Sequence, residues 1–478
     1  MNKPFYITTT LPYVNAEPHL GHAMEFVRAD VIARYKKSLG YDVFFNTGTD
    51  EHGIKILEGA EKEGMNVQDY VDRNALRFKE LYPKLGITDD IHFIRTTDDK
   101  HIKAAQEIWK RCFDNGYIYK KEYEAKYCVG CELYKTDSEL ENGKCPIHPN
   151  RDIEIIKEEN YFFAFSKIES KLRELYEKNP TLVIPDFRFN EIKAFLDRGL
   201  EDFSISRLKS KMSWGVPVPG DDEHVMYVWF DALTSYISTL GWPDEGGDFK
   251  YWKEGTPVQY CGKDNLRQQS AIWQGMLLAA GLPTTTNIII DGFIISGGQK
   301  MSKSIGNVIN PFDILEMFKD VTDYPEDILR FVLLHEVPSF EDGDITIESI
   351  KTAYTAYLAN GIGNLTSRIM KMATTNGVRQ QTIDKRQQKE IHEYDLNVSI
   401  KEIMHEVSLI DEYIATNEPF KVIKTDTEKG KEMIEHCLAS LEIVAEDLSS
   451  YLPRTSLKIL ECIRENKMPE KPLFNRLP

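Results

Sequence analysis

The sequence predicts an α/β protein, in which a doubly wound parallel sheet is split by an insertion and followed by an all-α helical bundle. Three observations support this fold class. Strand-like and helix-like segments alternate at the start of the chain, the alternation is interrupted from about residue 116 to residue 219, and no convincing strand follows residue 345. At about 150 residues per domain, the 478 residues suggest roughly three domains.

The start of the chain shows the βαβ rhythm of a doubly wound sheet. β-branched and aromatic runs predict its strands, and apolar residues at intervals of three and four predict its helices. A strand and a turn at Pro12 are expected within residues 5–13, a second strand at residues 41–45, and helices at residues 18–39, 66–85 and 98–115. We therefore expect residues 1–115 to form the first half of a Rossmann-like domain.

The alternation resumes after the interruption. Strands are expected at residues 224–230, 258–262 and 287–291, with a helix at about residues 266–281. These segments predict that residues 223–316 complete the sheet. Residues 116–222, which contain short hairpin-like pieces and a helix at about residues 168–177, are expected to form the insertion.

Helical periodicity dominates the rest of the chain. Apolar residues keep a helical period over residues 354–369, 400–414 and 433–444, and polar loops are expected near residues 375–388 and 424–430. We expect residues 317–345 to be a linker and residues 346–478 to form the helical bundle.

Composition and charge limit the classes of protein that this chain can be. Its 41% hydrophobic and 28% charged residues exclude wholesale disorder, and no apolar run approaches the roughly 20 residues that span a bilayer. The N-terminus lacks a secretory signal, so a cytoplasmic protein with no membrane partner is expected. The net charge of −17 argues against nucleic acid, but residues 346–478 hold 18 basic and 20 acidic side chains, or −2, which leaves −15 for the preceding residues.

Two motifs suit the binding of phosphate. Residues 19–22, His-Leu-Gly-His, lie between a predicted strand and its helix, where backbone N–H groups favour an anion and Gly21 permits close approach. Residues 296–304 place Lys300 and Lys303 behind a Gly-Gly hinge, which suits charge that develops on a phosphate leaving group. Each motif alone is more often an ordinary surface feature, whereas the two together in one split sheet are far more specific.

A cysteine cluster in the predicted insertion has the spacing of a metal site. Cys128 and Cys131, then Cys145 and His148, form two pairs with two residues between the members of each pair. Thiolates and one imidazole at this spacing are typical of a closed tetrahedral Zn²⁺ site, so we expect one structural zinc ion per chain. The other cysteines are expected to be buried thiols: Cys112, Cys261, Cys437 and Cys462.

The two phosphate motifs, in this order and separation, resemble the signatures of class I aminoacyl-tRNA synthetases. The resemblance covers residues from about 4 to 460 and is closest to the methionyl enzymes of that family. The segments that carry it are Tyr6-Ile-Thr-Thr-Thr-Leu-Pro-Tyr-Val-Asn15, Thr47-Gly-Thr-Asp-Glu-His-Gly53, Glu158-Glu-Asn-Tyr-Phe-Phe163, Ser204-Ile-Ser-Arg207, Trp214-Gly-Val-Pro-Val-Pro-Gly220 and Tyr227-Val-Trp-Phe-Asp-Ala232. It implies the same fold, with a zinc knuckle in the insertion, a stem-contact region at residues 317–345 and an anticodon-binding bundle.

The resemblance also implies roles for individual residues. ATP, accompanied by Mg²⁺, would be bound by His19, Gly21, His22, Asp264, Lys300 and Lys303. Of these, the catalytic residues would be His19, His22, Lys300 and Lys303. The methionine side chain would lie against Leu11, Tyr13, Trp229, Ala232, Leu233 and Tyr236, and its ammonium group would face Asp50. The anticodon would contact Asn364, Arg368 and Phe420.

One stretch departs from the family pattern. Asn265 and Gln269 stand where the family commonly has an isoleucine and a histidine at the border of the methionine pocket. An amide can still donate a hydrogen bond towards sulfur, so the departure leaves the amino-acid specificity open and does not affect the ATP motifs.

The resemblance implies a methionine–tRNA ligase, which forms methionyl-adenylate from methionine and ATP and passes the methionyl group to the 3′-terminal adenosine of methionine-accepting tRNA. The alternatives are a class I synthetase of another specificity, a small nucleotidylyltransferase and a non-catalytic tRNA-binding paralogue. About 100 residues of insertion leave no room for the editing domain of isoleucyl, valyl and leucyl enzymes, and four protein ligands deny zinc the open position that cysteinyl enzymes use. No oligonucleotide-binding barrel follows the bundle, so a monomer is expected.

Overall fold

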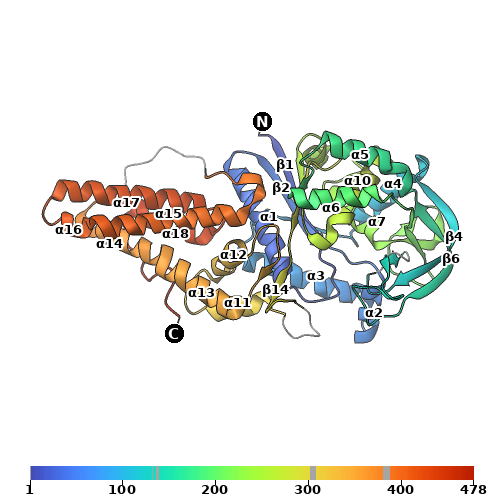
Figure 1. The fold of residues 1–478 in the computed structure, drawn as a ribbon, viewed down its shortest axis with the longest axis horizontal. Coiled ribbons are helices and arrows are strands. Elements are labelled where there is room, and N and C mark those ends of the chain that lie inside the picture. Colours follow the sequence, from blue (N-terminus) through green and yellow to red (C-terminus); the bar gives the residue numbers. More distant parts are fainter. Residues whose placement is uncertain (1, 132, 136–138, 302–307, 380–387, 478) are drawn as a thin grey trace.

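A computed structural model of the chain describes residues 2–131, 133–135, 139–301, 308–379 and 388–477. Within these residues, six strands form a parallel sheet with the order β3-β2-β1-β12-β13-β7 (Figure 1). The strands are β1 Pro4–Thr9, β2 Asp42–Thr49, β3 His92–Arg95, β7 Val183–Ile184, β12 Thr256–Gly262 and β13 Asn287–Asp291. Because β1 pairs directly with β12, strands from both ends of the predicted insertion share one sheet, which confirms the predicted fold class.

Helices cover both faces of the sheet. Successive residues of a strand point to opposite faces, so one strand contributes to the buried cluster on each side. On β1, Phe5 and Ile7 belong to one buried cluster and Tyr6 to another. The first cluster includes apolar residues of α1 (Leu20–Ser38) and α3 (Val67–Lys84), and α2 (Ile54–Glu63) packs on α3. Helices that contribute to the second cluster include α4 Asp99–Asp114, α5 Glu169–Lys178, α6 Asp186–Asp197, α9 Lys250–Lys253 and α10 Gln274–Ala280.

The predicted insertion forms its own antiparallel sheet and also returns to the main one. The antiparallel sheet has the order β5-β4-β6-β8, with β4 Ile118–Cys128, β5 Leu133–Lys135, β6 Glu154–Phe163 and β8 Phe203–Ser204. Between β6 and β8 the chain contributes β7 to the edge of the main sheet, where Val183 pairs with Ile288. The predicted helix near residues 168–177 is α5, which packs on α10.

The prediction of one strand at residues 224–230 is wrong. β11 (Asp221–Met226) lies in a small antiparallel sheet between β10 (Pro217–Val218) and β9 (Ser206–Leu208), outside the main sheet. A short helix, α7 (Val228–Ala232), follows directly, and α8 (Ser235–Ser238) follows α7. The apolar run was ambiguous because a buried strand and a buried helical turn carry the same residue types over so short a length.

The C-terminal part is helical, as predicted, and no strand follows Asp344 in the described residues. Its helices are α13 Ile347–Ala353, the π-helix η6 Tyr354–Gly363, α14 Asn364–Asn376, α15 Leu396–Asn417, α16 Pro419–Val422, α17 Thr427–Leu448 and α18 Pro453–Glu465. The loop predicted at residues 424–430 is shorter than expected. Asp426 caps α17 by accepting a hydrogen bond from the N–H of Lys429, so the helix starts inside that range.

No helix in the described parts of the chain is long and apolar enough to cross a membrane.

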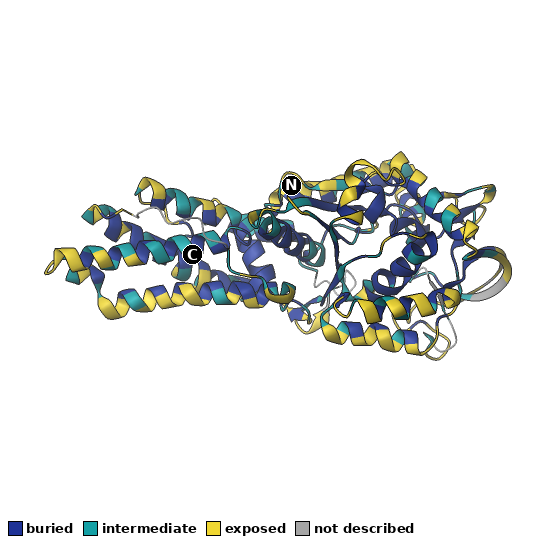
Figure 2. Cartoon of the chain, turned by 90° about the horizontal axis from the view of Figure 1, so that it is seen from above, coloured by how far each residue is buried: buried dark blue, intermediate teal, exposed yellow. Residues whose placement is uncertain are grey.

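The sheet and the bundle are joined by a buried junction. It contains α11 (Pro311–Phe318), α12 (Pro325–His335) and a small sheet of β14 (Ile294–Ser296), β15 (Gln299–Lys300) and β16 (Gly343–Asp344). The hydrophobic cluster under α1 continues through α12 into the interior of the bundle. In Figure 2 burial is dense at this junction, whereas exposed residues predominate at the outer end of the bundle.

A fully buried ion pair crosses the junction. The guanidinium of Arg330 on α12 lies 2.8 Å from the carboxylate of Asp30 on α1, and neither side chain is exposed. Arg330 also donates to the backbone carbonyls of Tyr451 at 2.7 Å and Ser450 at 3.0 Å, in the turn between α17 and α18. One side chain therefore bonds the sheet's first helix and the bundle at once.

We predict that Arg330→Met lowers the free energy of unfolding by about 3–5 kcal/mol, because it removes one partner of a buried pair and leaves the Asp30 carboxylate under-compensated. Urea denaturation measures this. Arg454→Met is the matched control, because the Arg454 side chain is 61% exposed and its ion pair with Glu326 is long, at 3.8 Å. Its effect on the free energy of unfolding should stay within about 0.5 kcal/mol. Equal effects of the two substitutions would contradict the prediction.

Candidate active site and metal-binding cluster

A cavity of about 390 Å³ lies at the carboxyl ends of the central strands, which is where doubly wound sheets bind their ligands. Its walls come from the loops that follow β1, β12 and β13, the first turn of α1, the end of β2, and α7 with α8. The predicted ATP and methionine residues that line it are Leu11, Tyr13, His19, Gly21, His22, Asp50, Trp229, Ala232, Leu233, Tyr236, Asp264 and Asn265. Residues from both halves of the split sheet thus meet in one cavity.

His19 and His22 form the first turn of α1 with their rings stacked 3.8 Å apart. The N–H of Gly21 donates to Nδ1 of His19 at 3.1 Å, and the N–H of His19 donates to Nδ1 of His22 at 3.3 Å. Burial, and then the neighbouring His19, hold the pKa of His22 well below its usual value. A neutral ring that accepts through Nδ1 carries its proton on Nε2, so the pair can donate hydrogen bonds to an anion at the helix N-terminus.

Gly21 lets the His19 ring lie close to the backbone of this turn. A Cβ at residue 21 would lie 2.9 Å from Cε1 of His19, closer than real Cβ contacts. The sequence suggested that Gly21 makes room for a ligand, and the structure adds that it makes room for the His19 ring.

Two carboxyl groups of the cavity, Glu25 and Asp291, were missed by sequence reasoning. The N–H of Thr10 donates to Glu25 at 2.6 Å, and burial, then the nearby Asp291, raise the pKa of Glu25 well above its usual value. Burial also raises the pKa of Asp291 to about 7. Glu25 follows His22 by three residues, so helical periodicity could have indicated that it shares a face with the histidine pair.

The part of the cavity predicted to hold the amino acid has an apolar wall and is lined by the carboxylate-bearing residue Asp50. The wall comes from α7 and the turn after it, where residues at i, i+3 and i+4 face the cavity: Trp229, Ala232 and Leu233. Asp50 is held against the loop after β1, because its N–H donates to the carbonyl of Pro12 at 2.9 Å and its carbonyl accepts from the N–H of Val14 at 3.2 Å.

Gln269 is not among the residues that line the cavity, and it contacts the lining residue Tyr236 instead. Its Nε2 donates to the hydroxyl of Tyr236 at 2.5 Å, and its Oε1 accepts from Nε2 of Gln259 at 2.5 Å. Gln269 is a buried residue of the π-helix η5 (Gln268–Trp273). Gln269 thus supports the wall residue Tyr236 from behind, whereas Asn265 lines the cavity itself.

The lysine motif is described only in part. The backbone of Lys300 ends β15, and the neighbouring Met301 lines the cavity. The side chain of Lys300 and the whole of Lys303 lie outside the described residues.

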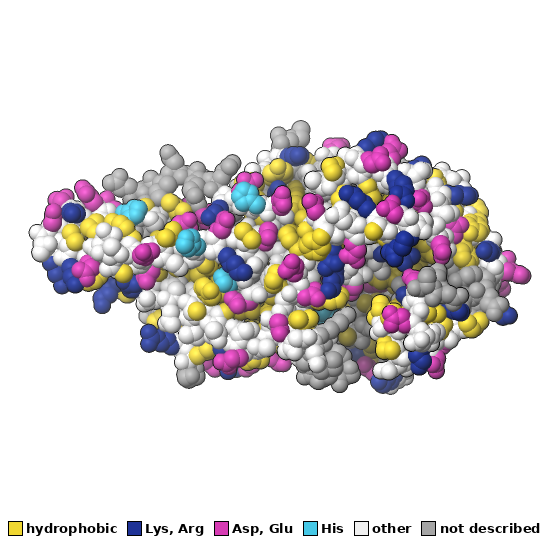
Figure 3. Space-filling model, viewed as in Figure 1, with side chains coloured by type: hydrophobic (Ala, Val, Ile, Leu, Met, Phe, Trp, Pro, Cys, Tyr) yellow, Lys and Arg dark blue, Asp and Glu magenta, His cyan; other side chains and the backbone are white. Residues whose placement is uncertain are grey.

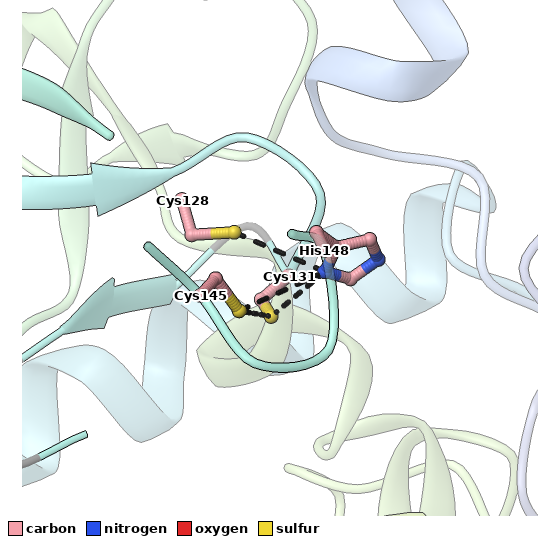
Figure 4. A group of neighbouring side chains, drawn as sticks. All are labelled: Cys128, Cys131, Cys145 and His148. Atoms are coloured by element: carbon pink, nitrogen blue, oxygen red, sulfur yellow. Dashed lines mark hydrogen bonds between the residues drawn. The ribbon is translucent and has the colours of Figure 1, made fainter. Parts of the chain in front are cut away.

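The four predicted metal ligands come together in the insertion (Figure 4). One ligand atom from each of Cys128, Cys131, Cys145 and His148 lies within 4.8 Å of all the others. The Sγ atoms of Cys131 and Cys145 are 3.4 Å apart, too far for a disulfide, and His148 Nδ1 lies 3.2 Å from Cys131 Sγ and 3.9 Å from Cys128 Sγ. Ligand bonds of about 2.3 Å for sulfur and 2.0 Å for nitrogen at tetrahedral angles imply separations of about 3.5–3.8 Å, so the group fits one metal ion.

The backbone at Gly130 allows His148 to approach closely. A Cβ at residue 130 would lie 2.3 Å from Cγ of His148, so only Gly130 lets the histidine approach the first cysteine pair. Cys131 also lines the cavity, which places the cluster next to the candidate active site. The remaining cysteines, Cys112, Cys261, Cys437 and Cys462, are free and buried, as predicted.

The predicted anticodon residues lie on the bundle, away from the cavity. Asn364 and Arg368 are one turn apart on α14, and Arg368 forms an ion pair with Asp411 of α15. Phe420 on α16 is 40% exposed, and the ammonium of Lys421 lies 6.0 Å from the centre of its ring. Figure 1 shows α14 and α16 in the part of the bundle that projects from the sheet.

The bundle surface carries both signs of charge. Figure 3 shows basic and acidic side chains interspersed over the visible face, with several basic side chains along the lower edge of the outer end. Some of these charges pair with one another, as Lys421 does with Glu418 at 2.6 Å. On this face, basic side chains of the bundle alternate with acidic ones.

The chain as a whole is similar to known proteins. Residues 5–155 and 137–370 match the family model for tRNA synthetases class I (M). The methionine–tRNA ligase of Brucella suis is 37% identical over 481 residues, which cover 96% of this chain and 91% of the relative. That of Thermotoga maritima is 44% identical over 374 residues, which cover 77% of this chain and 57% of the relative.

Solved structures agree over the whole chain. The Mycobacterium tuberculosis methionyl-tRNA synthetase in complex with methionyl-adenylate matches with a TM-score of 0.89 and 30% identity, covering 100% of this chain and 98% of that chain. The apo form of the same enzyme matches with a TM-score of 0.83 and 28% identity, covering 100% of this chain and 99% of that chain.

A family model that spans more than half of the chain, on a sheet with this cavity, defines a class I tRNA synthetase. The relatives that align along nearly its full length are methionine–tRNA ligases, and the chain belongs to that family.

Proposed function

We propose that this chain is a methionine–tRNA ligase that activates methionine with ATP and transfers the methionyl group to the 3′-terminal adenosine of methionine-accepting tRNA. One observation carries the proposal. A single cavity joins a histidine pair at the N-terminus of α1 to an apolar pocket faced by Asp50, so a nucleotide triphosphate and an apolar amino acid can lie side by side.

In this proposal the Asp50 carboxylate faces the substrate ammonium group, while Trp229 and Tyr236 contact the thioether side chain. A thioether is polarizable and packs well against aromatic rings. The substrate carboxylate then points towards the first turn of α1, where His19 and His22 bind the phosphates. The pocket selects methionine by shape and by sulfur–aromatic contact, with Asn265 in its wall and Gln269 acting through Tyr236.

The first step is an in-line displacement at the α-phosphate of ATP. A carboxylate oxygen of methionine forms a bond to phosphorus as the bond to the bridging oxygen breaks, which yields methionyl-adenylate and pyrophosphate. His19 and His22 donate to phosphate oxygens as charge builds, and Lys300 and Lys303 stabilise the departing pyrophosphate. Mg²⁺, bound with ATP, supplies additional positive charge to the phosphates. Asp264 lies near the ribose.

The second step transfers the methionyl group to tRNA. A ribose hydroxyl of the terminal adenosine attacks the methionyl carbonyl carbon, and AMP leaves. No covalent enzyme intermediate is required, so orientation of the two substrates accounts for most of the catalysis.

ATP–pyrophosphate exchange tests the proposal. We expect exchange with methionine and not with isoleucine, valine or leucine, and we expect Lys303→Ala to reduce the rate of exchange by about 100-fold or more while methionine binding is retained.

Lys178→Ala, on the exposed end of α5, is the matched control and should exchange at the wild-type rate. Strong exchange with another amino acid and none with methionine would overturn the specificity. Normal exchange by Lys303→Ala would overturn the role of the lysine motif.

We also propose that the cluster of Cys128, Cys131, Cys145 and His148 holds one structural Zn²⁺ ion per chain. Three thiolates and an imidazole fill a tetrahedral site, so no position is left for a substrate. A small insertion gains folding free energy from such an ion.

Cys145→Ser should lower the zinc content of the purified protein from about one ion per chain to near zero and make residues 116–222 more sensitive to limited proteolysis, because a hydroxyl is a poor zinc ligand. Cys112→Ser, at a buried cysteine outside the cluster, should keep its zinc. Metal analysis that finds no zinc in the wild-type protein would contradict this role.

For RNA recognition, we propose that Asn364 and Arg368 hydrogen-bond to anticodon bases and that Phe420 stacks on one of them. Exposed aromatic rings beside hydrogen-bonding side chains are the usual way to bind splayed-out bases of an RNA loop. In the absence of RNA, Asp411 holds Arg368 in place. Lys371 and Lys421 complete a limited basic stripe.

Phe420→Ala should raise the KM for tRNA in aminoacylation by about 5- to 100-fold, the cost of one lost base stack, and leave ATP–pyrophosphate exchange unchanged. Phe187→Ala is the matched control, because Phe187 is also exposed, at 46%, but lies on α6. An unchanged KM for tRNA would remove Phe420 from the RNA-binding surface.

We propose that the chain acts as a cytoplasmic monomer. Its parts are assigned as a catalytic domain at residues 1–115 and 223–316, a connective insertion at residues 116–222, a stem-contact region at residues 317–345 and an anticodon-binding domain at residues 346–478.

A further inference from the structure

The side chains of three consecutive residues after β2 point to different surroundings: Asp50 to the cavity, Glu51 to Arg95 and His52 to Asp231. Asp50 lines the cavity, whereas Glu51 and His52 are buried behind it. Glu51 accepts two hydrogen bonds from the guanidinium of Arg95, at 2.7 and 2.9 Å, and its carbonyl accepts from the indole N–H of Trp214 at 2.6 Å. The loop that presents Asp50 is therefore fixed immediately downstream of it.

His52 connects this loop to α7. Its Nδ1 lies 2.6 Å from one carboxylate oxygen of Asp231, and the other oxygen lies 2.6 Å from Nε2 of His101 on α4. His101 in turn bonds through Nδ1 to the hydroxyl of Ser238 on α8, at 3.0 Å. Asp231 and His101 are fully buried. We call these four side chains, His52, His101, Asp231 and Ser238, the Asp231 junction.

The two histidines of the Asp231 junction stabilise the ionised form of the Asp231 carboxylate. Burial alone would raise the pKa of Asp231, but the charge and hydrogen bonds of His52 and His101 outweigh burial and lower it to about 2. The carboxylate is therefore ionised at any working pH, and a buried carboxylate without its donors would be costly. Each oxygen accepts from a histidine on a different element, so neither histidine can replace the other.

The junction lies between the two walls of the amino-acid pocket. On one side, His52 is two residues after Asp50. On the other side, α7 carries Trp229 and Ala232 into the cavity on either side of Asp231 in the sequence. Asp231 itself does not line the cavity, so it can act on a substrate only through these neighbours.

We propose that Asp231 is a positioning residue that sets the distance between the carboxylate of Asp50 and the apolar wall of the amino-acid pocket. The proposal rests on the proposed function. The junction holds the ammonium-binding loop to α7 by one hydrogen bond and braces α7 against α4 by another. Its hydrogen bonds join the loop after β2 to α4, α7 and α8, which border the amino-acid side of the cavity, so we expect an effect on amino-acid binding and not on ATP binding.

Asp231→Asn tests this in ATP–pyrophosphate exchange with the full chain. The asparagine oxygen can still accept from one histidine, while its NH₂ group faces the N–H of the other, so one arm of the junction is broken. We expect the KM for methionine to rise by about 10- to 100-fold, as for a displacement of about 1 Å, and the KM for ATP to stay within about twofold. An unchanged KM for methionine, or equal changes in both constants, would overturn the proposal.

A second pair of variants decides the matter if Asp231→Asn does not fold. His101→Gln keeps an N–H donor near the position of Nε2, whereas His101→Phe has none. The KM for methionine should therefore rise more in His101→Phe than in His101→Gln, and equal constants in the two variants would count against the junction.

Asp327→Asn is the matched control. Asp327 is also fully buried and accepts a backbone N–H, that of Thr455, at 2.6 Å, but it lies on α12. This substitution should lower the melting temperature without changing the KM for methionine. If a buried carboxylate only stabilised the fold, Asp231→Asn and Asp327→Asn would behave alike.

The wild-type protein separates this proposal from the proposed function. If it activates a different amino acid, the specificity is overturned, and the same variants are measured with that amino acid because the junction borders the same pocket. If the wild-type behaves as proposed and only the variants fail to show the split between the two KM values, the junction alone is overturned.

Discussion

Buried arginines on two crossing helices hold the sheet and the bundle in one fixed relation. Arg28 of α1 donates to the backbone carbonyls at and after the end of α12, among them Val337 at 2.8 Å and Pro338 at 3.0 Å. Arg330 of α12 reaches back to Asp30 of α1 at 2.8 Å. Each helix therefore supplies one arginine to the other, and removing either cation would leave several buried oxygens without it.

The same helix α1 also begins with the histidine pair. Its first turn presents His19 and His22 to the cavity, while Arg28 and Asp30, two to three turns further on, anchor the bundle. Arg28 is also 3.9 Å from Asp291, a carboxylate of the cavity wall. The turn that carries the histidine pair and the residues that anchor the bundle thus belong to one helix.

The sequence predicted most of what touches the cavity and little of what supports it. Residue types with a direct chemical role are visible in short motifs, so His19, His22, Asp50 and the four metal ligands could be found from spacing and resemblance. Supporting contacts join residues far apart in the chain, as in Asp231 with His52, and no local pattern marks such a pair.

The strand predicted at residues 224–230 was wrong for a related physical reason. The run at residues 224–230 was assigned to one strand because apolar content does not distinguish a strand end from a helical turn, and only the position of α7 against the cavity decides between them. Gln269 was expected beside the pocket from the resemblance alone, and in the structure it lies on the π-helix η5 and donates to Tyr236.

The central position of β1 bears on how the protein is made. β1 is the first strand of the chain, yet it lies between β2 and β12, and Phe5 is the direct partner of Thr256. During synthesis at roughly 5–20 residues per second, one edge of β1 waits on the order of 12–50 s before the ribosome delivers its second neighbour about 250 residues later. Until then the half-built sheet has an open edge, and the nascent chain is exposed to aggregation or chaperone binding over that interval.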